Sequence, residues 1–281
     1  MLNKRLPVLC IVSITLFCAG IYATHASIKD TLSVSYLDVG QGDSIFIETK
    51  EGTQMLIDGG RDDRVLIKLK EVMPVGDTSI DIVIGTHPDA DHIGGLVSVL
   101  KNYKIGMILE PGSSSDSKIY KALEDEISKD KINRVLARQG MVINLGDGAT
   151  FKILFPDQDV TNWETNDSSV VGKLVYGKDS FLFTGDSPIK IEDYLLDTVP
   201  AELSSRVLKL GHHGSRTSSS TEYLKAVSPH VGIISAGLHN SYGHPHQETL
   251  GRLKELGIPY LSTTDKGTIT FTSNGFGIVQ K

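Results

Sequence analysis

Cysteine is almost absent from this sequence. Both cysteines, Cys10 and Cys18, lie near the start of the 281-residue chain. Residues 19–281 therefore offer no pair of thiols for a disulfide bond, and a metal bound there must be held by nitrogen and oxygen atoms. Tryptophan is equally scarce: Trp163 is the only one, in a polar stretch (156–164) that predicts a surface loop.

Acidic side chains outnumber basic ones in this sequence. The net charge is −6, and without residues 1–26, which contain Lys4 and Arg5 but no acid, it falls to −8. A domain this acidic does not attract nucleic acid through its overall charge. A phosphate-bearing substrate would have to be held locally, by metal and a few basic side chains.

The amino terminus predicts export. Lys4 and Arg5 precede an apolar run, residues 6–22, and small residues follow, so cleavage after Ala26 would complete a secretory signal (residues 1–26). The alternative is an uncleaved membrane anchor at residues 6–23, since the run is near the lower length limit for a span. Both predict an extracytoplasmic protein in contact with the membrane only through this segment. No low-complexity linker interrupts residues 31–281, which predicts one domain.

Strands and helices alternate in the sequence pattern. Residues 32–39 alternate like a half-buried strand, and the apolar run 80–84 predicts a buried strand followed by a helix at 91–100. Residues 260–279 predict a hairpin-like β region. Strands dominate both ends and strand–helix units fill the middle, which indicates an α/β class.

Four potential metal ligands crowd the loop after residues 80–84: His87, Asp89, Asp91 and His92. Such loops carry the chemistry of many α/β proteins. Neighbouring carboxylates repel one another unless a cation neutralises them, and imidazole with carboxylate suits zinc, manganese or iron. The alternative is an ordinary polar loop in which Asp91 caps the helix.

Three further segments place ligand-type residues after apolar strands: Asp186 in 184–186, His212 and His213 between two glycines, and the loop 242–246. Singly, each has a plain alternative: a turn, a buried structural histidine or a surface loop. Their shared pattern predicts convergence on one site. Since the carboxylates and imidazoles exceed four, we expect an open catalytic site rather than a closed structural one.

Residues 87–92 resemble the His-x-His-x-Asp-His signature of the metallo-β-lactamase fold, with Asp89 in the place of the second histidine. Segments 58–60, 184–186 and 212–215 match the family in its order. Segments 38–44, 166–169 and 240–246 more narrowly resemble the soluble domain of ComEC-like competence proteins. The resemblance implies an α/β (α+β) fold, the four-layer αββα metallo-β-lactamase sandwich. Because the sequence carries no multi-span channel region, we expect the hydrolase domain without the channel.

The resemblance also implies a site with one or two divalent ions, Zn²⁺ or Mn²⁺. Asp186 would bridge the ions, and Asn166 stands where the family's third histidine for the first ion is expected. The implied ligands are, for the first ion, His87 and Asp89, and for the second, Asp91, His92 and His212. The oxygen-rich first site favours a harder ion such as manganese.

The implied chemistry is metal-assisted hydrolysis, in which the ions lower the pKa of a bound water and supply hydroxide. Asp91 and Asp186 would be catalytic, with His246 as the candidate acid. Candidate substrate-binding residues are Asn166, His213, Ser215, Arg216 and Tyr242; exposed loop polarity is the alternative for the loop residues.

We expect an exported phosphodiesterase of nuclease type. The ComEC-like motifs favour DNA as the phosphate-ester substrate, and the export signal leaves cell-wall phosphodiesters open. One alternative is hydrolysis of amides or lactones, including β-lactams. Another is a non-catalytic metal-binding module that partners a membrane channel for DNA uptake.

Overall fold

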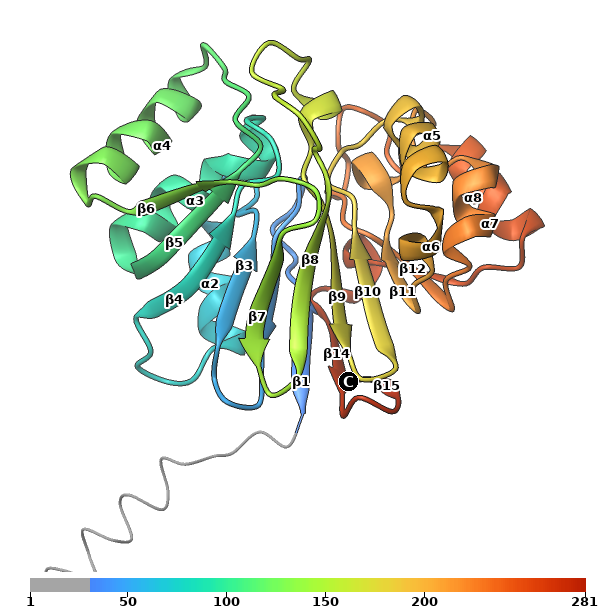
Figure 1. The fold of residues 1–281 in the computed structure, drawn as a ribbon, viewed down its shortest axis with the longest axis horizontal. Coiled ribbons are helices and arrows are strands. Elements are labelled where there is room, and N and C mark those ends of the chain that lie inside the picture. Colours follow the sequence, from blue (N-terminus) through green and yellow to red (C-terminus); the bar gives the residue numbers. More distant parts are fainter. Residues whose placement is uncertain (1–30) are drawn as a thin grey trace, which may run out of the picture. The chain divides into compact units, whose positions relative to one another are not determined.

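Two β-sheets pack face to face at the centre of the structure, a computed structural model that describes residues 31–281 (Figure 1). The first sheet has the strand order β15-β14-β1-β2-β3-β4-β5-β6, and the second β13-β12-β11-β10-β9-β8-β7. The strands of the first sheet are β1 (Leu32–Tyr36), β2 (Ile45–Glu48), β3 (Gln54–Ile57), β4 (Ser79–Ile84), β5 (Lys104–Glu110), β6 (Asn133–Leu136), β14 (Ile269–Ser273) and β15 (Ile278–Gln280). Those of the second are β7 (Val142–Gly146), β8 (Ala149–Phe155), β9 (Val171–Tyr176), β10 (Asp179–Phe183), β11 (Val207–Lys209), β12 (Val231–Ile234) and β13 (Tyr260–Ser262).

Helices cover the outer face of each sheet, which confirms the predicted αββα sandwich (Figure 1). The first sheet carries α2 (Arg64–Val72), α3 (Ala90–Asn102) and α4 (Lys118–Lys129), and the second carries α5 (Ile189–Thr198), α6 (Pro200–Leu203), α7 (Thr221–Val227) and α8 (Gln247–Glu255). Short turns of helix are η1 (Asn166–Ser168), η2 (Gly211–Gly214) and α9 (Thr263–Lys266).

Strand alternation builds this layering. In β2, Ile45 and Ile47 join the core between the sheets, whereas Phe46 packs under the helices of the first sheet with Leu69 and Leu96. Successive side chains of a strand point to opposite faces, so a strand buried on both faces is apolar throughout. The core is therefore three apolar layers that hold the two sheets and their helices in fixed positions.

One predicted element is wrong. Residues 260–279 do not form a single hairpin: β13 runs parallel to β12 in the second sheet, whereas β14 and β15 pair antiparallel in the first. The α9 turn lies between them and carries the chain from one sheet to the other. Short strand-like segments predict strands but not the sheet to which each belongs.

The predicted signal or anchor, residues 1–26, lies outside the described residues. Residues 31–281 cluster as one compact unit. Within this range no helix has both the length and the apolar character needed to cross a bilayer.

Candidate metal centre

The carboxyl ends of three strands bring the predicted ligands together. His87 follows β4, Asp186 follows β10, and His212 and His213 follow β11, while His92 lies in the first turn of α3. β4 belongs to the first sheet and β10 and β11 to the second, so both halves of the sandwich contribute. Ligand sites in α/β proteins form at such strand ends.

Asp186 lies at the middle of the cluster and is almost completely buried. Four imidazole Nε2 atoms approach its carboxylate. The distances are 3.2 Å to Oδ1 from His92 and, to Oδ2, 3.3 Å from His213, 3.6 Å from His212 and 3.9 Å from His87. The other two predicted carboxylates flank the histidines: Asp89 Oδ2 lies 3.6 Å from His87 Nε2, and Asp91 Oδ2 lies 3.4 Å from His213 Nε2.

Three of these histidines are held from behind through Nδ1. His92 donates to Asp58 Oδ2 at 2.8 Å, and His213 to the Ser235 carbonyl at 2.9 Å. The Thr86 hydroxyl donates to Asp58 Oδ2 at 2.7 Å, so its oxygen accepts from His87 Nδ1 at 3.0 Å. With Nδ1 used as the donor, each of these rings turns its Nε2 atom toward Asp186, the orientation of metal-binding histidines.

The backbone is strained where it presents these groups. His212 and His213 have φ of 48° and 56°, and Asp58 has φ of 58°. The left-handed region is unfavourable for residues other than glycine and persists only where the surrounding structure imposes it. Here it turns two consecutive histidines toward one carboxylate.

Charge in the cluster is unevenly shared. Burial lowers the pKa of His92 and of His213, but Asp186 and the carboxylate behind each ring, Asp58 or Asp43, outweigh burial and raise both pKa values well above the ordinary one. Burial and the charge on His92 lower the pKa of His87 to about 4. The Asp186 pKa is well below its usual range, because the charges of His213 and His92 outweigh its burial. The buried carboxylates are therefore ionised and stabilise a positive charge placed beside them.

The donor set fits a divalent cation. His87 Nε2 and Asp186 Oδ1 are buried without a hydrogen-bond partner among the described residues. Ligand atoms of Asp43, His92, Asp186 and His213 lie within 4.8 Å of one another. We place Asp43 behind the His213 ring rather than among the ligands, because Asp43 Oδ1 lies 3.2 Å from His213 Nδ1 and Oδ2 pairs with Lys209 at 2.8 Å. Imidazole and carboxylate donors suit zinc, manganese or iron.

The cluster thus contains the six predicted metal ligands: His87, Asp89, Asp91, His92, Asp186 and His212. His213, predicted to contact substrate, lies closer to Asp186 than His212 does. The N-cap position of α3 is occupied by Asp89, not by Asp91, and neither carboxylate caps the helix through a side-chain hydrogen bond. The capping alternative for Asp91 is therefore wrong.

The predicted substrate-binding residues lie around this cluster. Asn166 begins η1, and its Oδ1 is buried without a hydrogen-bond partner. Ser215 is buried, with its hydroxyl 2.9 Å from Thr217 Oγ1. The Arg216 side chain is 62% exposed and lies 3.9 Å from Glu248.

The loop before α8 places a different histidine at the centre. His246, the predicted acid, occupies the N-cap position of α8 and accepts a hydrogen bond from the Arg216 amide at 3.1 Å. His244 lies nearer, with its ring 5.3 Å from that of His212. Tyr242, half exposed, stacks on His244 at 5.6 Å. His244 and His246 flank Pro245, so the sequence alone does not show which of the two lies nearer the centre. The prediction therefore named His246 and missed His244.

Asp43, Asp58 and Lys209 were also missed as site residues. Asp43 and Asp58 stand in motifs that carry the family resemblance, which was the available signal. Lys209 is fully buried beside Asp43 and donates to the Leu210 carbonyl at 2.9 Å. Nothing in the sequence pattern distinguishes this lysine from an exposed one.

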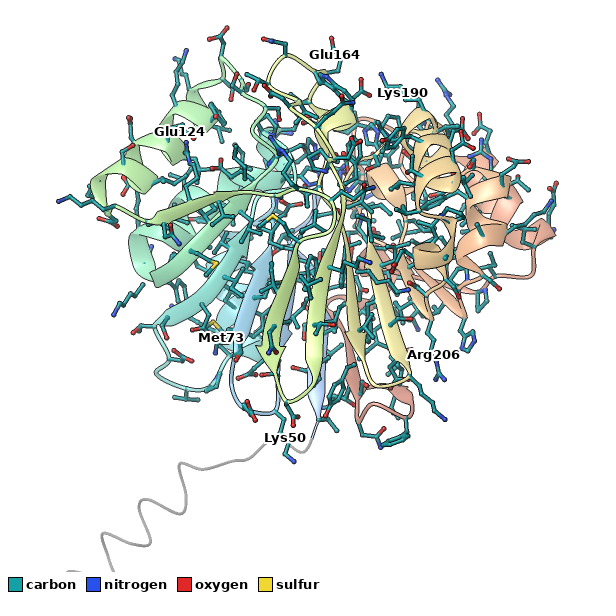
Figure 2. All side chains as sticks on the ribbon, in the orientation of Figure 1. Lys50, Met73, Glu124, Glu164, Lys190 and Arg206 are labelled. Atoms are coloured by element: carbon teal, nitrogen blue, oxygen red, sulfur yellow. The ribbon has the colours of Figure 1, made fainter. Side chains whose placement is uncertain are left out.

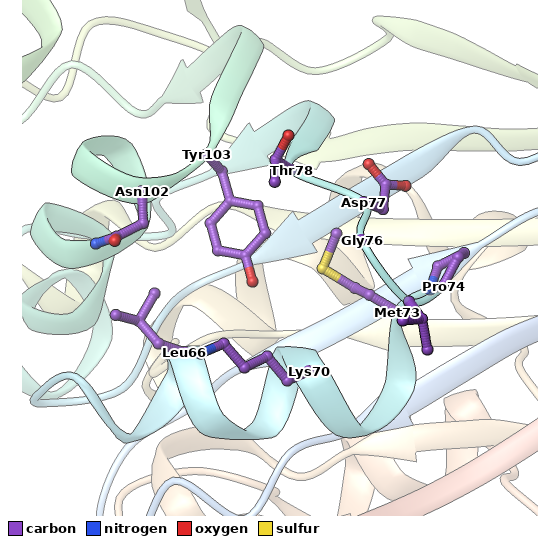
Figure 3. A pocket seen from close by; sticks show the side chains of 10 residues that line it. Leu66, Lys70, Met73, Pro74, Gly76, Asp77, Thr78, Asn102 and Tyr103 are labelled. Carbon is purple, nitrogen blue, oxygen red and sulfur yellow. The ribbon is translucent and has the colours of Figure 1, made fainter.

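A cavity of about 440 Å³ lies away from the centre (Figure 3). Leu66, Lys70, Met73 and Tyr103 are among its walls, which come from α2, the loop before β4 and the end of α3. It adjoins the start of β4, whereas His87 follows the end. Six residues of strand separate these points by about 20 Å, so this cavity is not part of the candidate centre.

Comparison with known proteins gives a consistent picture. The family model of the Metallo-beta-lactamase superfamily matches residues 37–238. ComE operon protein 3 of Bacillus subtilis is 31% identical over 260 residues, which cover 85% of this chain and 32% of that protein. Competence protein ComA of Neisseria gonorrhoeae is 32% identical over 254 residues, covering 89% and 33%. This chain therefore spans about a third of the length of these relatives.

The solved structure of YhfI, a metallo-beta-lactamase fold protein from Bacillus subtilis, superimposes with a TM-score of 0.58 at 12% identity. The match covers 86% of this chain and all of that one, and it confirms the fold alone. The predicted resemblance to competence proteins of this fold is likewise confirmed by the two relatives.

Proposed function

This chain belongs to the metallo-beta-lactamase superfamily, and we propose that it is an exported, metal-dependent phosphodiesterase of nuclease type. The observation that carries the proposal is the convergence of four imidazole Nε2 atoms on the buried Asp186 carboxylate, with Asp89 and Asp91 beside them. A structural zinc site needs four ligands, and this cluster offers more.

The cluster residues, with Asp186 at their middle, would hold one or two ions, Zn²⁺ or Mn²⁺. Asp89 makes the His87 side richer in oxygen, which suits manganese. A divalent ion bound there supplies Lewis acidity: it lowers the pKa of the attacking water and stabilises charge on the phosphoryl group.

The surrounding residues would bind and orient the substrate. Arg216 presents an exposed guanidinium, which matches the geometry of a phosphate. The buried Asn166 Oδ1 accepts no hydrogen bond from the described residues, so it can accept one from substrate or water. His244, whose pKa burial and the neighbouring histidines lower to about 4, is neutral at pH 7 and can receive a proton there.

The names of the similar proteins support DNA as the substrate and a role in DNA uptake, since ComA is a competence protein and a further relative beside ComE operon protein 3, 33% identical, is recombination protein 2 of Haemophilus influenzae. We propose that a membrane channel is the partner and that the amino-terminal segment directs the domain outside the cytoplasm. The net charge of −8 without that segment implies that DNA is held locally at the metal centre.

A substrate panel tests this function. The purified chain, stripped with EDTA and reloaded with zinc or manganese, should hydrolyse bis(p-nitrophenyl) phosphate and linear DNA but not nitrocefin. Asp186→Asn should abolish turnover, whereas Asp116→Asn, at a fully exposed carboxylate, should not. Nitrocefin turnover alone would indicate a lactam hydrolase. Tight metal binding without turnover of any substrate would indicate a binding module.

A further inference from the structure

A cavity of about 320 Å³ is walled by three aromatic rings, one from β8, one from α5 and one from the loop between β8 and η1. The Phe155 ring lies 6.1 Å from that of Trp163 and 6.0 Å from that of Tyr194. Ile191 completes the apolar wall. In a chain with 6% aromatic residues, three rings around one opening form an unusual concentration. We call this cavity the aromatic pocket.

The aromatic pocket shares its loop with the candidate metal centre. Asp167 lines the pocket, and two residues later the Ser169 hydroxyl accepts the backbone N–H of Asp186 at 3.2 Å. Thr165, on the other side of Asp167, hydrogen-bonds Asp89 through its side chain. Since consecutive Cα atoms are about 3.8 Å apart, the pocket begins within about 8 Å of residues that hold the centre.

The position of the aromatic pocket in the fold also places it near the metal centre. Lys190 lines the pocket and follows Asp186 by four residues, in the first turn of α5. Figure 2 shows Lys190 and Glu164, from the loop between β8 and η1, at one end of the sandwich, with Met73 and Lys50 toward the other. The pocket and the centre therefore lie at the same end of the sandwich, close enough for one substrate to reach both.

The chemistry of the walls specifies a planar ring with polar edges. Aromatic side chains stack on a base, because every base presents a π face. Gln158 offers an amide, while Lys190 and Asp167, paired with each other, offer a donor and an acceptor at the rim. The Lys190 side chain is 64% exposed and places positive charge where a phosphate would enter.

We propose that the aromatic pocket binds a nucleobase of a single-stranded DNA substrate whose phosphodiester lies at the candidate metal centre. The proposal rests on the proposed function and deepens it, because it assigns single strands rather than duplex as the substrate. A base paired and stacked within a duplex has no free face for the rings.

Trp163 supplies the signal for the test, since it is the chain's only tryptophan. The wild-type chain loaded with zinc is titrated with phosphorothioate hexathymidylate, which resists hydrolysis, and with a phosphorothioate hexamer of abasic deoxyribose phosphate. We expect saturable quenching of Trp163 fluorescence by the first and none by the second. Equal quenching by both would reduce the pocket to a phosphate site and overturn the proposal. Quenching by N-acetylglucosamine but not by hexathymidylate would make it a sugar site and overturn it too.

A matched pair of variants tests the same contact by fluorescence anisotropy of labelled hexathymidylate. Trp163→Leu should bind at least about tenfold more weakly. Phe276→Leu should bind like the wild type, because Phe276 is an exposed aromatic in the turn between β14 and β15, at the end of the sandwich opposite the centre. Wild-type affinity in Trp163→Leu would contradict the proposal. If that variant does not fold, Tyr194→Leu replaces it.

The outcome is separable from that of the proposed function. DNA hydrolysis with added metal, combined with the absence of base-dependent quenching, would retain the phosphodiesterase and reject the aromatic pocket. Base-dependent quenching without hydrolysis would retain the pocket on a domain that binds DNA but does not cut it.

Discussion

The Nε2 atoms of His92 and His213 lie 3.3 Å apart. His92 belongs to a helix of the first sheet and His213 follows a strand of the second, so this contact joins the two halves of the sandwich. Each ring is held through Nδ1, His92 by Asp58 and His213 by the Ser235 carbonyl. Because both rings are held in place, a proton or a metal cation must lie between their Nε2 atoms and the Asp186 carboxylate.

Metal loading should therefore release protons. Asp186 and the carboxylates behind the rings raise the pKa values of His92 and His213, so both rings carry protons at neutral pH in the metal-free chain. A metal ion needs the bare Nε2, so its apparent affinity should rise with pH. Isothermal titration calorimetry with zinc in two buffers of different ionisation enthalpy measures the release. His92→Gln should reduce it, and His230→Gln, at an exposed histidine, should not. Equal enthalpies in both buffers would contradict the prediction.

His244 should matter more for turnover than His246. The His244 ring approaches both histidines after β11, whereas His246 Nδ1 is engaged by the Arg216 amide. If His244 transfers a proton, His244→Ala should lower kcat for bis(p-nitrophenyl) phosphate by about 100-fold. His246→Ala should lower it less. The reverse order would restore His246 as the acid, and metal content of both variants is the control.

The buried Lys209–Asp43 pair gives a stability prediction. Lys209→Met leaves the Asp43 carboxylate buried without its cation, which should cost about 3–5 kcal/mol of unfolding free energy. The double variant Lys209→Met/Asp43→Asn should recover most of that loss, because neither charge remains. Urea denaturation measures both. Lys121→Met, which removes an exposed lysine 3.5 Å from Asp116, is the control and should change stability by about 1 kcal/mol or less. Additive losses in the double variant would show that the pair is not coupled.

The sequence predicts the ligand loops better than their surroundings. His87, Asp186 and His212 each follow an apolar strand. Asp186 and His212 follow the parallel pair β10 and β11, whose carboxyl ends meet at one edge of the second sheet, so this local regularity makes their approach predictable. His87 follows β4 of the first sheet and reaches them through the packing of the two sheets.

The groups behind the ligands depend on contacts distant in sequence. Asp43 meets Lys209 across 166 residues, and Asp58 meets His92 across 34. A carboxylate in a turn has the same local pattern whether it supports a histidine or faces water. The assignment of β13 to the second sheet is non-local for the same reason, because it depends on pairing with β12.

Glu110 should make stability fall as pH rises. Burial raises the pKa of Glu110 to about 7, although Arg134 lies 2.7 Å away and opposes the shift. The folded chain therefore binds a proton that the unfolded chain releases above its ordinary pKa of 4.5. The stabilisation is complete below about pH 4.5 and is lost as pH rises through about 7, a change of about 3 kcal/mol.

Glu110→Gln removes this dependence, because the amide does not titrate. Urea unfolding in EDTA at pH 5 and pH 8 should show the wild type losing stability relative to Glu110→Gln as pH rises. The exposed Glu255→Gln should follow the wild type at both values. A constant difference between wild type and Glu110→Gln would place the Glu110 pKa near its ordinary value. It would also show that Arg134 fully compensates for the burial of this carboxylate.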